Sequence, residues 1–304
     1  MHICVIGDSE DLSCVYIGYL ARRRGIDVLE LREDTLGYHW NFRLDDSSSR
    51  GDHLAVGDAT YPFTEVCGVF VRLNPRPLQP PNLKLTPQSE HAFIVERRNG
   101  IQYLLDHLPM VVANRPSAGR SNGSKPYQMR LLAAFGFDVP KWLTSNEEEA
   151  IQEFAESCSQ GVIYKSCSGL RSRVRKLDDE VLQRMKNGST PVVVQEYVPG
   201  RDVRVHTVIN GVFPTEVVGG GVDYRFEHEH CLYRATVVPD EIADMCCRFA
   251  KLERLVIAGF DFRVTDDGRW FCLEMNPVPT FLPYEMSTTQ PIGDAVLDLM
   301  CSTP

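Results

Sequence analysis

Short apolar runs alternate with amphipathic segments over the first third of the chain, beginning at residues 3–8. Strands that alternate with helices in this way are typical of a parallel βα layer. Strands are expected at residues 3–8, 27–31, 66–73 and 110–114, and helices at about 14–24 and 88–105. Residues 32–62 carry only a weak pattern, and a polar run there marks a loop or tight turn. The layer contains no Gly-x-Gly-x-x-Gly sequence, so it predicts no dinucleotide site.

The segment at residues 115–125 is rich in Pro, Ser, Gly and Asn and separates this layer from the rest of the chain. Helices are then expected at 125–135 and 239–253, among strands at 141–144, 161–165, 191–197, 202–208 and 212–218. Asn146 is the expected N-cap of a further helix. The overall prediction is an α/β fold with a parallel N-terminal domain (1–113), followed by a central (114–190) and a C-terminal (191–304) α+β subdomain.

Residues 259–277 give the strongest local signal in the sequence. Two strand-like runs, 260–265 and 269–275, flank the pair Asp267-Gly268, and an Asp-Gly pair between such runs is typical of a β-hairpin. A two-residue turn at this pair would put Arg263 opposite Cys272 and Asp261 opposite Glu274. The hairpin is therefore expected to bring two carboxylates together.

Facing carboxylates destabilise a sheet unless a cation relieves their repulsion. Strand alternation puts Asn276 on the same face as Glu274. Together with Asp261 these side chains offer three hard oxygen ligands, a set that suits Mg²⁺ bound alongside substrate phosphates. The alternative is an edge hairpin whose scattered charges face solvent.

Composition narrows the class of protein. The chain has 304 residues, 43% of them hydrophobic and 24% charged, with a net charge of −9. This acidic balance argues against non-specific nucleic-acid binding and favours a partner with localised negative charge, such as ATP. The ten cysteines lack paired Cys-x-x-Cys spacing, and neither a signal peptide nor a membrane-spanning run is evident. We therefore expect a cytoplasmic enzyme with reduced cysteines and no membrane partner.

Lys165 ends a predicted strand and leads into a polar loop with Ser168 and Gly169, followed by Arg171 and Arg173. Backbone N–H groups of such a loop can surround phosphate oxygens, and the lysine adds a positive charge. An ordinary hairpin with solvated arginines is the alternative.

His228 and His230 are close enough in sequence to suggest a metal, but no third ligand is evident. A loop that contacts substrate or solvent is therefore favoured over a zinc site.

The order of these motifs resembles the ATP-grasp superfamily of carboxylate–amine ligases. The order is Lys125, then Tyr-Lys-Ser at 164–166, then Gln-Glu-Tyr-Val-Pro-Gly-Arg-Asp-Val-Arg at 195–204, then Asp261, Glu274 and Asn276. The resemblance covers residues from about 114 to the end of the chain. Within the superfamily, the sequence is most similar to ribosomal-protein glutamate ligases and graspetide (microviridin-type) macrocyclases. Residues 277–281 (Pro-Val-Pro-Thr-Phe) replace the Gly-containing segment usual in graspetide enzymes, which leaves the substrate open.

The resemblance implies the ATP-grasp fold and a role for each matching residue. The ATP phosphates would be held by Lys125 and Lys165, with the polar loop at Ser168 and Gly169. The adenine and ribose would be held by Gln195, Glu196, the backbone of Val198 and Asp202. Mg²⁺, with two ions expected, would be held by Asp261, Glu274 and Asn276. The catalytic candidates, which would stabilise charge on an acyl phosphate, are Arg204 and Arg263, with an ion pair to the acids as the alternative for Arg263.

The implied function is an ATP-dependent ligase that activates a carboxylate as an acyl phosphate, releases ADP and couples the acid to an amine. The expected substrate is a peptide or amino acid in a biosynthetic pathway. Two alternatives stay open: a ligase acting on free amino acids or dipeptides, and a nucleotide-binding module without catalysis. The sequence does not decide the oligomeric state, and a homodimer is compatible with it.

Overall fold

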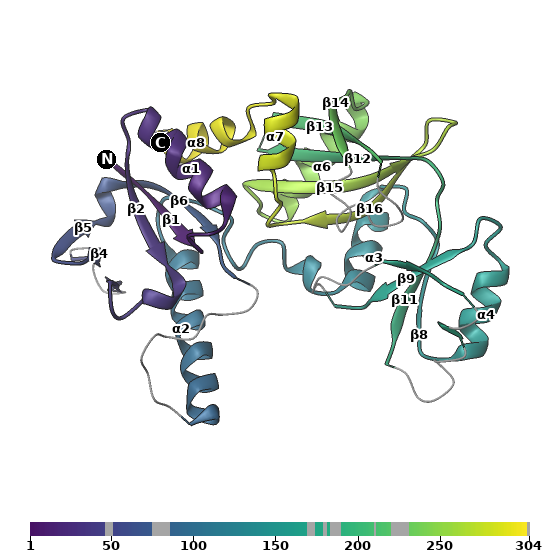
Figure 1. Cartoon of the computed structure of the whole chain (residues 1–304), viewed down its shortest axis with the longest axis horizontal. Helices are drawn as coiled ribbons and strands as arrows, with labels where there is room; N and C mark the ends of the chain where they lie inside the picture. Colours follow the sequence, from purple (N-terminus) through teal and green to yellow (C-terminus); the bar gives the residue numbers. More distant parts are fainter. Residues whose placement is uncertain are drawn as a thin grey trace.

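The computed structural model describes residues 1–45, 51–74, 86–168, 174–178, 181–182, 190–209, 211–219 and 231–302. Its strands form four sheets. Figure 1 shows an N-terminal body at the left, a five-stranded sheet at the upper right and a smaller sheet at the lower right. Five positions that the sequence singled out, Gly169, Arg171, Arg173, His228 and His230, lie outside the described residues.

The N-terminal body is a parallel sheet, as predicted, and its strand order is β2-β1-β6-β7. Its strands are β1 (His2–Gly7), β2 (Asp27–Arg32), β6 (Val66–Arg72) and β7 (Val111–Ala113). Alternate residues of β1 enter different cores: Ile3 and Val5 pack with α1 (Leu12–Arg23) and α8 (Ile292–Cys301), whereas Cys4 and Ile6 pack with α2 (Pro87–His107). The sheet is therefore covered by helices on both faces.

The sequence showed only a weak pattern over residues 32–62, with a loop or tight turn at a polar run, and no strand was predicted there. The described residues form an antiparallel sheet of β3 (Trp40–Arg43), β4 (His53–Val56) and β5 (Ala59–Pro62). Each strand has only four residues, so no periodic pattern could develop. Trp40 and Leu54 nevertheless anchor the sheet in the core beneath α2.

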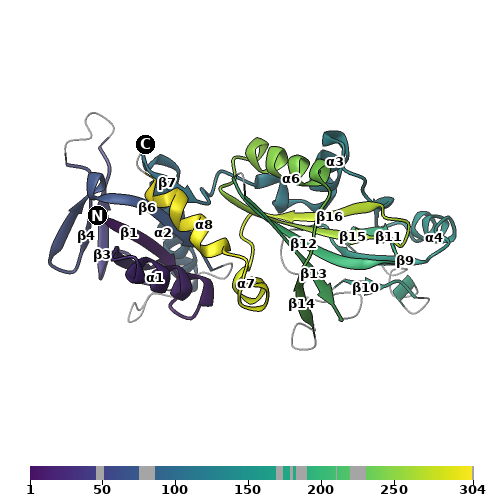
Figure 2. The ribbon, with the colours of Figure 1, turned by 90° about the horizontal axis from the view of Figure 1, so that it is seen from above.

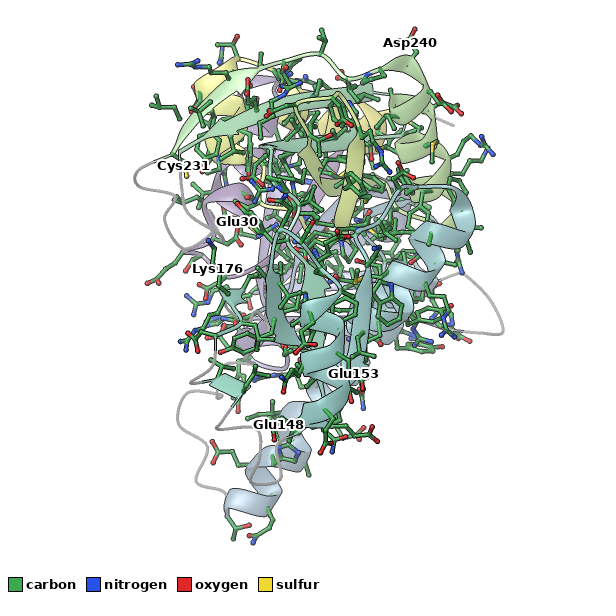
Figure 3. All side chains as sticks on the ribbon, turned by 90° about the vertical axis from the view of Figure 1, so that its right-hand side faces the viewer. Glu30, Glu148, Glu153, Lys176, Cys231 and Asp240 are labelled. Carbon is green, nitrogen blue, oxygen red and sulfur yellow. The ribbon has the colours of Figure 1, made fainter. Side chains whose placement is uncertain are left out.

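The smaller sheet at the lower right of Figure 1 has the order β10-β9-β11-β8 and is antiparallel. Its strands are β8 (Trp142–Ser145), β9 (Val162–Ser166), β10 (Arg175–Lys176) and β11 (Val192–Glu196), and α4 (Glu148–Glu156) packs on it through a separate core. In Figure 3, the labelled Glu148 and Glu153 project from α4 in the lower half, far from Asp240 at the top. The predicted N-cap at Asn146 was wrong, because Glu147 occupies that position and its N–H is bonded to Ser145 Oγ (2.9 Å).

The five-stranded sheet has the order β14-β13-β12-β15-β16. It is built from β12 (Arg201–Val208), β13 (Gly211–Val218), β14 (Leu232–Ala235), β15 (Ile257–Val264) and β16 (Trp270–Asn276). One face packs against α3 (Lys125–Phe135) and α6 (Asp240–Leu252), which lie on the same side of the sheet in Figure 2. Phe260 and Phe262 of β15 point into that core. Strand alternation therefore turns Asp261 and Arg263 to the opposite face.

The last two helices return the chain to the N-terminal body. Glu285, in α7 (Leu282–Thr288), accepts hydrogen bonds from the Tyr16 hydroxyl (2.8 Å) and the Gly293 N–H (2.8 Å), so it links α1, α7 and α8. Burial raises the pKa of the Glu285 carboxyl, and these hydrogen bonds oppose the shift. Among the described residues, no helix has the length and apolar character needed to cross a membrane.

The hairpin β15–β16 confirms the pairing of Asp261 with Glu274 but not the turn from which it was predicted. The turn holds three residues rather than two, because Thr265 pairs with Arg269 and Gly268 adopts a positive φ of 86°. Arg263 consequently faces Phe271, not Cys272. A bulge at Leu273 then shifts the register by one residue and restores the Asp261–Glu274 pair.

Candidate active site

The polar face of β12, β15 and β16 carries a set of ion pairs that we call the charged wall: Arg204–Asp261, Arg263–Asp202 and Lys125–Glu274. Arg204 Nη1 lies 2.8 Å from Asp261 Oδ1, and Arg263 Nη1 lies 2.9 Å from Asp202 Oδ2. These two pairs follow from the register, because Arg204 is opposite Asp261 and Asp202 is opposite Arg263. The sequence left an ion pair with the acids of the hairpin as the alternative for Arg263; the observed partner is Asp202 instead, and the catalytic role of Arg263 stays a prediction.

The third pair of the charged wall joins two subdomains of the sequence prediction. Lys125 Nζ, at the start of α3, lies 3.1 Å from Glu274 Oε2 on β16, and both side chains are largely buried. The facing carboxylates of Asp261 and Glu274 are therefore each neutralised by a protein cation. A divalent ion could compete with Arg204 and Lys125, because it would contact the same carboxylate oxygens as these two side chains.

The donor chemistry of the charged wall fits Mg²⁺. Asp261, Glu274 and Asn276 supply carboxylate and amide oxygens, the ligands that a hard cation prefers. Asn276 Oδ1 accepts one hydrogen bond from the Val278 N–H (2.9 Å), which leaves a lone pair for a further contact. Within the described part of the chain, no group of three or more His, Cys, Asp and Glu side chains is arranged to hold a metal. Any ion would therefore depend on phosphate or water oxygens as well.

Gly259 permits the arrangement of Arg204. A Cβ atom at this position would overlap the guanidinium of Arg204, which would then have to shift away from its present place. The guanidinium therefore crosses β15 directly above a glycine on its way to Asp261. The glycine is needed here for a close approach.

Lys165 and Gln195 form a second polar group on neighbouring strands of the smaller sheet. Lys165 Nζ donates a 2.7 Å hydrogen bond to Gln195 Oε1, and both residues are buried. The loop after Lys165 approaches α3, because the Lys125 N–H is bonded to the Cys167 carbonyl (2.9 Å) and Ser168 forms a β-bridge with Ser124. The two lysines predicted to hold phosphates are thus connected through one loop. Gly169 lies just beyond the described residues.

The predicted adenine edge follows β11. Glu196 is tied to Lys141 by a backbone hydrogen bond of 2.9 Å, and Val198 is buried. The Tyr197 ring lies near Arg263, whose Cζ is 5.9 Å from the ring centroid, and Arg263 also bonds Asp202. The residues predicted for adenine and ribose therefore adjoin one end of the charged wall.

Gln128 is a site residue that sequence reasoning missed. Its buried side-chain amide donates to the Met275 carbonyl (2.8 Å) and accepts from the Met275 N–H (3.0 Å). Met275 lies between Glu274 and Asn276, so Gln128 fixes the strand that carries both predicted metal ligands. A glutamine within a helix gives no sequence signal for such a contact.

Asn114 has a similar positioning role. Its Oδ1 accepts from the N–H groups of Val256 (2.6 Å) and Ile257 (3.1 Å), and its Nδ2 donates to the carbonyls of Ile257 (2.6 Å) and Pro277 (2.5 Å). One side-chain amide therefore joins the end of the N-terminal body to the start of β15 and to the residue that follows β16.

His206, on β12, lies next to Arg204. Its Nε2 is 3.1 Å from the Thr280 carbonyl and 3.5 Å from Arg204 Nε, and a single Nε2 atom cannot both donate and accept. We assign the proton to Nε2, because the contact with Thr280 is shorter. Burial, with a smaller effect of Arg204, lowers the pKa of His206 well below 6.5 and keeps the ring neutral.

The segment after Asn276 is held from the N-terminal body. Arg72, the last residue of β6, donates to the carbonyl of Pro279 (2.9 Å) and is paired with Asp11 at 2.7 Å. Asp11 also caps α1, since its carboxylate accepts from the N–H groups of Ser13 and Cys14. The parallel layer therefore helps to shape the exit of the charged wall.

Known proteins resemble this chain over about half of its sequence and over its whole fold. No protein-family model matches the chain. A D-alanine–D-alanine ligase of Aquifex aeolicus (strain VF5) is 25% identical over 170 residues, which is 51% of this chain and 58% of the relative. The match thus spans little more than half of that enzyme.

Solved structures match over the whole length. The macrocyclase MdnC of Microcystis aeruginosa MRC, bound with its precursor peptide MdnA, has a TM-score of 0.84 at 21% identity, with 100% of both chains covered. The ATP-grasp ligase PsnB, complexed with a minimal precursor, has a TM-score of 0.78 at 25% identity, with 98% of both chains covered. The predicted α/β architecture of the ATP-grasp fold is confirmed, as is the resemblance to ATP-grasp ligases.

Proposed function

We propose that this chain, which has the fold of the ATP-grasp ligases, is an ATP-dependent ligase that joins a carboxylate to an amine. The substrate carboxylate attacks the γ-phosphorus of ATP, forming an acyl phosphate and ADP, and the amine then displaces phosphate. The observation that carries the proposal is the charged wall, where Asp261 and Glu274 face each other between Arg204 and Lys125. Such a reaction mainly needs positioning and charge neutralisation, which this set of groups supports.

The chain's own residues divide the work as follows. Lys125 and Lys165 neutralise phosphate charge from two sides, and the loop at Ser168 and Gly169 adds N–H donors. Gln195, Glu196, Val198 and Asp202 hold the nucleoside along β11 and the start of β12. Arg204 stabilises negative charge on the acyl phosphate and the tetrahedral intermediate. Arg263 has a supporting role, because its pairing with Asp202 orients the carboxylate.

ATP and Mg²⁺ are the proposed cofactors. PsnB has been solved with Mg and ADP and with AMPPNP, which supports the same pair for this chain. Asp261, Glu274 and Asn276 would hold two ions, which would screen the phosphates when bound.

A peptide is the favoured substrate. MdnC and PsnB were each solved with a precursor peptide, and their structures match this chain almost from end to end. The D-alanine–D-alanine ligase favours instead a free amino acid as a second candidate. We further expect a reducing compartment such as the cytoplasm, and a homodimer is one arrangement to be tested.

The test is to incubate the pure protein with ATP, Mg²⁺ and a short acidic peptide or a free acidic amino acid, each with an amine. Release of ADP and phosphate that depends on the acid is the expected result. Stimulation by the peptide alone supports peptide modification, and stimulation by the amino acid alone supports the second candidate. Release of AMP and pyrophosphate would contradict the mechanism, and ATP binding without turnover on any acid would favour the non-catalytic module.

A further inference from the structure

A cleft of about 550 Å³ lies between the N-terminal body and the segment that follows it. Its floor and walls come from β6, α2, the stretch 114–123, Ser168, and the pair Pro277 and Val278. This volume is within the usual range for small-molecule sites and could take one amino-acid residue with its neighbouring backbone. Ser168 is the one predicted nucleotide-binding residue among the described residues that line the cleft, and none of the predicted metal ligands lines it.

The charge of this cleft is opposite to that of the chain. Three arginines, Arg98, Arg115 and Arg120, are among the described residues that line it, and none of those residues is acidic. The whole chain, by contrast, carries 41 acidic and 32 basic residues. The cleft therefore favours an anionic occupant.

The three arginines differ in what neutralises them. Arg98 is paired with Glu33, whose Oε2 lies 2.8 Å from its Nη2. Arg115 donates to the carbonyls of Leu105 (2.6 Å), Leu108 (2.7 Å) and Met110 (2.9 Å), so it is fixed at the end of α2. Asp106 attracts its charge, but within the described residues no carboxylate oxygen forms a direct ion pair with it.

Arg120, in the short 3-10 helix Arg120–Gly123, is exposed and has neither an ion pair nor a side-chain hydrogen bond among the described residues. Two positive charges in the cleft are therefore available to a ligand. One is rigid and one can move.

The cleft also offers neutral donors. The side-chain amides of Gln102 and Asn122 line it, and neither makes a hydrogen bond within the described residues. Amide side chains can donate to and accept from a peptide backbone. Apolar walls from Val71, Leu73 and Ala118 would cover the aliphatic part of a side chain.

One end of the cleft reaches the charged wall. Pro277 and Val278 come directly after Asn276, and the Val278 N–H is bonded to the Asn276 side chain. Ser168 also lines the cleft and forms a β-bridge with Ser124, next to Lys125. A carboxylate held in the cleft would therefore lie beside the residues proposed to hold the phosphates.

From these observations we infer that the cleft binds the acid-bearing substrate, an acidic residue within a peptide, with Arg120 and Arg115 meeting its carboxylate and Gln102 and Asn122 its flanking backbone. The inference deepens the proposed function and rests on it for the fate of the bound acid. Binding itself does not depend on catalysis, so the two can be tested separately.

The test measures binding of a fluorescently labelled Glu-rich hexapeptide to the full chain by anisotropy, without ATP. Arg120→Glu should weaken binding by about tenfold or more, because attraction becomes repulsion. Gln102→Glu, which keeps the shape and adds one negative charge, should weaken it as well. A matched hexapeptide with Gln in place of Glu should bind poorly to every variant, and free glutamate in competition separates a single amino acid from a peptide.

Arg130→Glu is the matched control, since Arg130 is exposed on α3 and does not line the cleft. Equal losses in Arg120→Glu and Arg130→Glu would overturn the inference, as would wild-type affinity in Arg120→Glu or no binding to the wild type. In turnover, Arg120→Glu should raise the KM for the peptide and leave the KM for ATP unchanged. If Arg120→Glu releases ADP with an unchanged KM for the peptide, the role of the cleft is refuted and the proposed function stands. If the peptide binds in the cleft but no ADP is released, the proposed function is refuted and the role of the cleft stands.

Discussion

The charged wall and the cleft both contain arginines, but they use positive charge in opposite ways. In the wall, the side chains of Arg204 and Arg263 are only 5% and 11% exposed, and each contacts a carboxylate at less than 3 Å. In the cleft, Arg120 is exposed and contacts no acid of the described residues. Arginines that are paired with carboxylates are held in fixed positions before a ligand binds. An arginine without a carboxylate partner can instead form its ion pair with the ligand.

The difference suggests how one molecule can serve two ligands. ATP and Mg²⁺ need fixed positions for several charges at once, and a pre-formed network supplies them. An acidic substrate that can bind in more than one position needs electrostatic attraction without a fixed geometry. An exposed arginine at a cleft supplies this attraction at little cost in stability. The wall should therefore respond to mutation in turnover and stability, and the cleft in substrate affinity.

The largest expected effect comes from breaking the wall at Glu274. Glu274→Gln removes a carboxylate that faces Asp261 and contacts Lys125. We expect turnover to fall by about 10³-fold or more, because a lost electrostatic group at a reacting phosphate has an effect of that order. Steady-state ADP release measures the loss. Circular dichroism should show an intact fold.

Glu216→Gln provides the control, because Glu216 lies on β13 in a looser pair with Arg201 at 3.8 Å. It should keep turnover near that of the wild type. Comparable activity in both variants would rule out a role for Glu274 in catalysis.

A second prediction contrasts the two arginines directly in stability. Arg204→Met leaves Asp261 buried without this cation and should lower the free energy of unfolding by about 3 kcal/mol or more. Arg120→Met should change it by less than about 0.5 kcal/mol, as is usual for exposed side chains. Urea unfolding of the two variants measures both values. Similar losses in both would remove the distinction between wall and cleft.

The smallest expected effect concerns pH and the residue under the wall. Burial lowers the pKa of His206 well below 6.5, so the unfolded chain takes up a proton near pH 6.5 that the folded chain does not. This residue's contribution to stability is therefore complete above pH 6.5 and falls as the pH drops below it, by at most about 1.4 kcal/mol per pH unit.

His206→Gln, whose amide can still donate to the Thr280 carbonyl, should show a weaker loss on acidification. Urea midpoints at two pH values above and below 6.5 give the slopes. Identical slopes for wild type and variant would show that His206 is not the responsible group.

The hairpin illustrates what sequence patterns can and cannot predict. The facing of Asp261 and Glu274 was predicted from the Asp-Gly pair, yet the turn has three residues and Leu273 is bulged. Two deviations of one residue cancel, so the pairing near the site is right and that near the turn is wrong. The alternation of side chains predicts which face of the sheet a residue occupies. It does not predict where a bulge occurs, because a bulge depends on the local twist of the strand.

Other site residues were invisible for a different reason. Gln128 and Asn114 act through hydrogen bonds to backbone atoms about 140 residues away along the chain. Such contacts depend on tertiary packing and leave no local spacing in the sequence. The phosphate, metal and nucleoside candidates could be named because each lies in a compact motif, whereas the groups that position them are scattered.

The attachment of α3 has a consequence for nucleotide binding. Leu132 of α3 and Phe137, just beyond its end, share a core with Phe249 of α6 and Phe260 of β15, while Ile151 and Val194 belong to the separate core of the smaller sheet. Lys125 is therefore anchored to the core of the five-stranded sheet, and Lys165 to the smaller sheet, whose core is separate. A nucleotide bound by both lysines would link the two, and its measured affinity would include the free energy of fixing their relative positions.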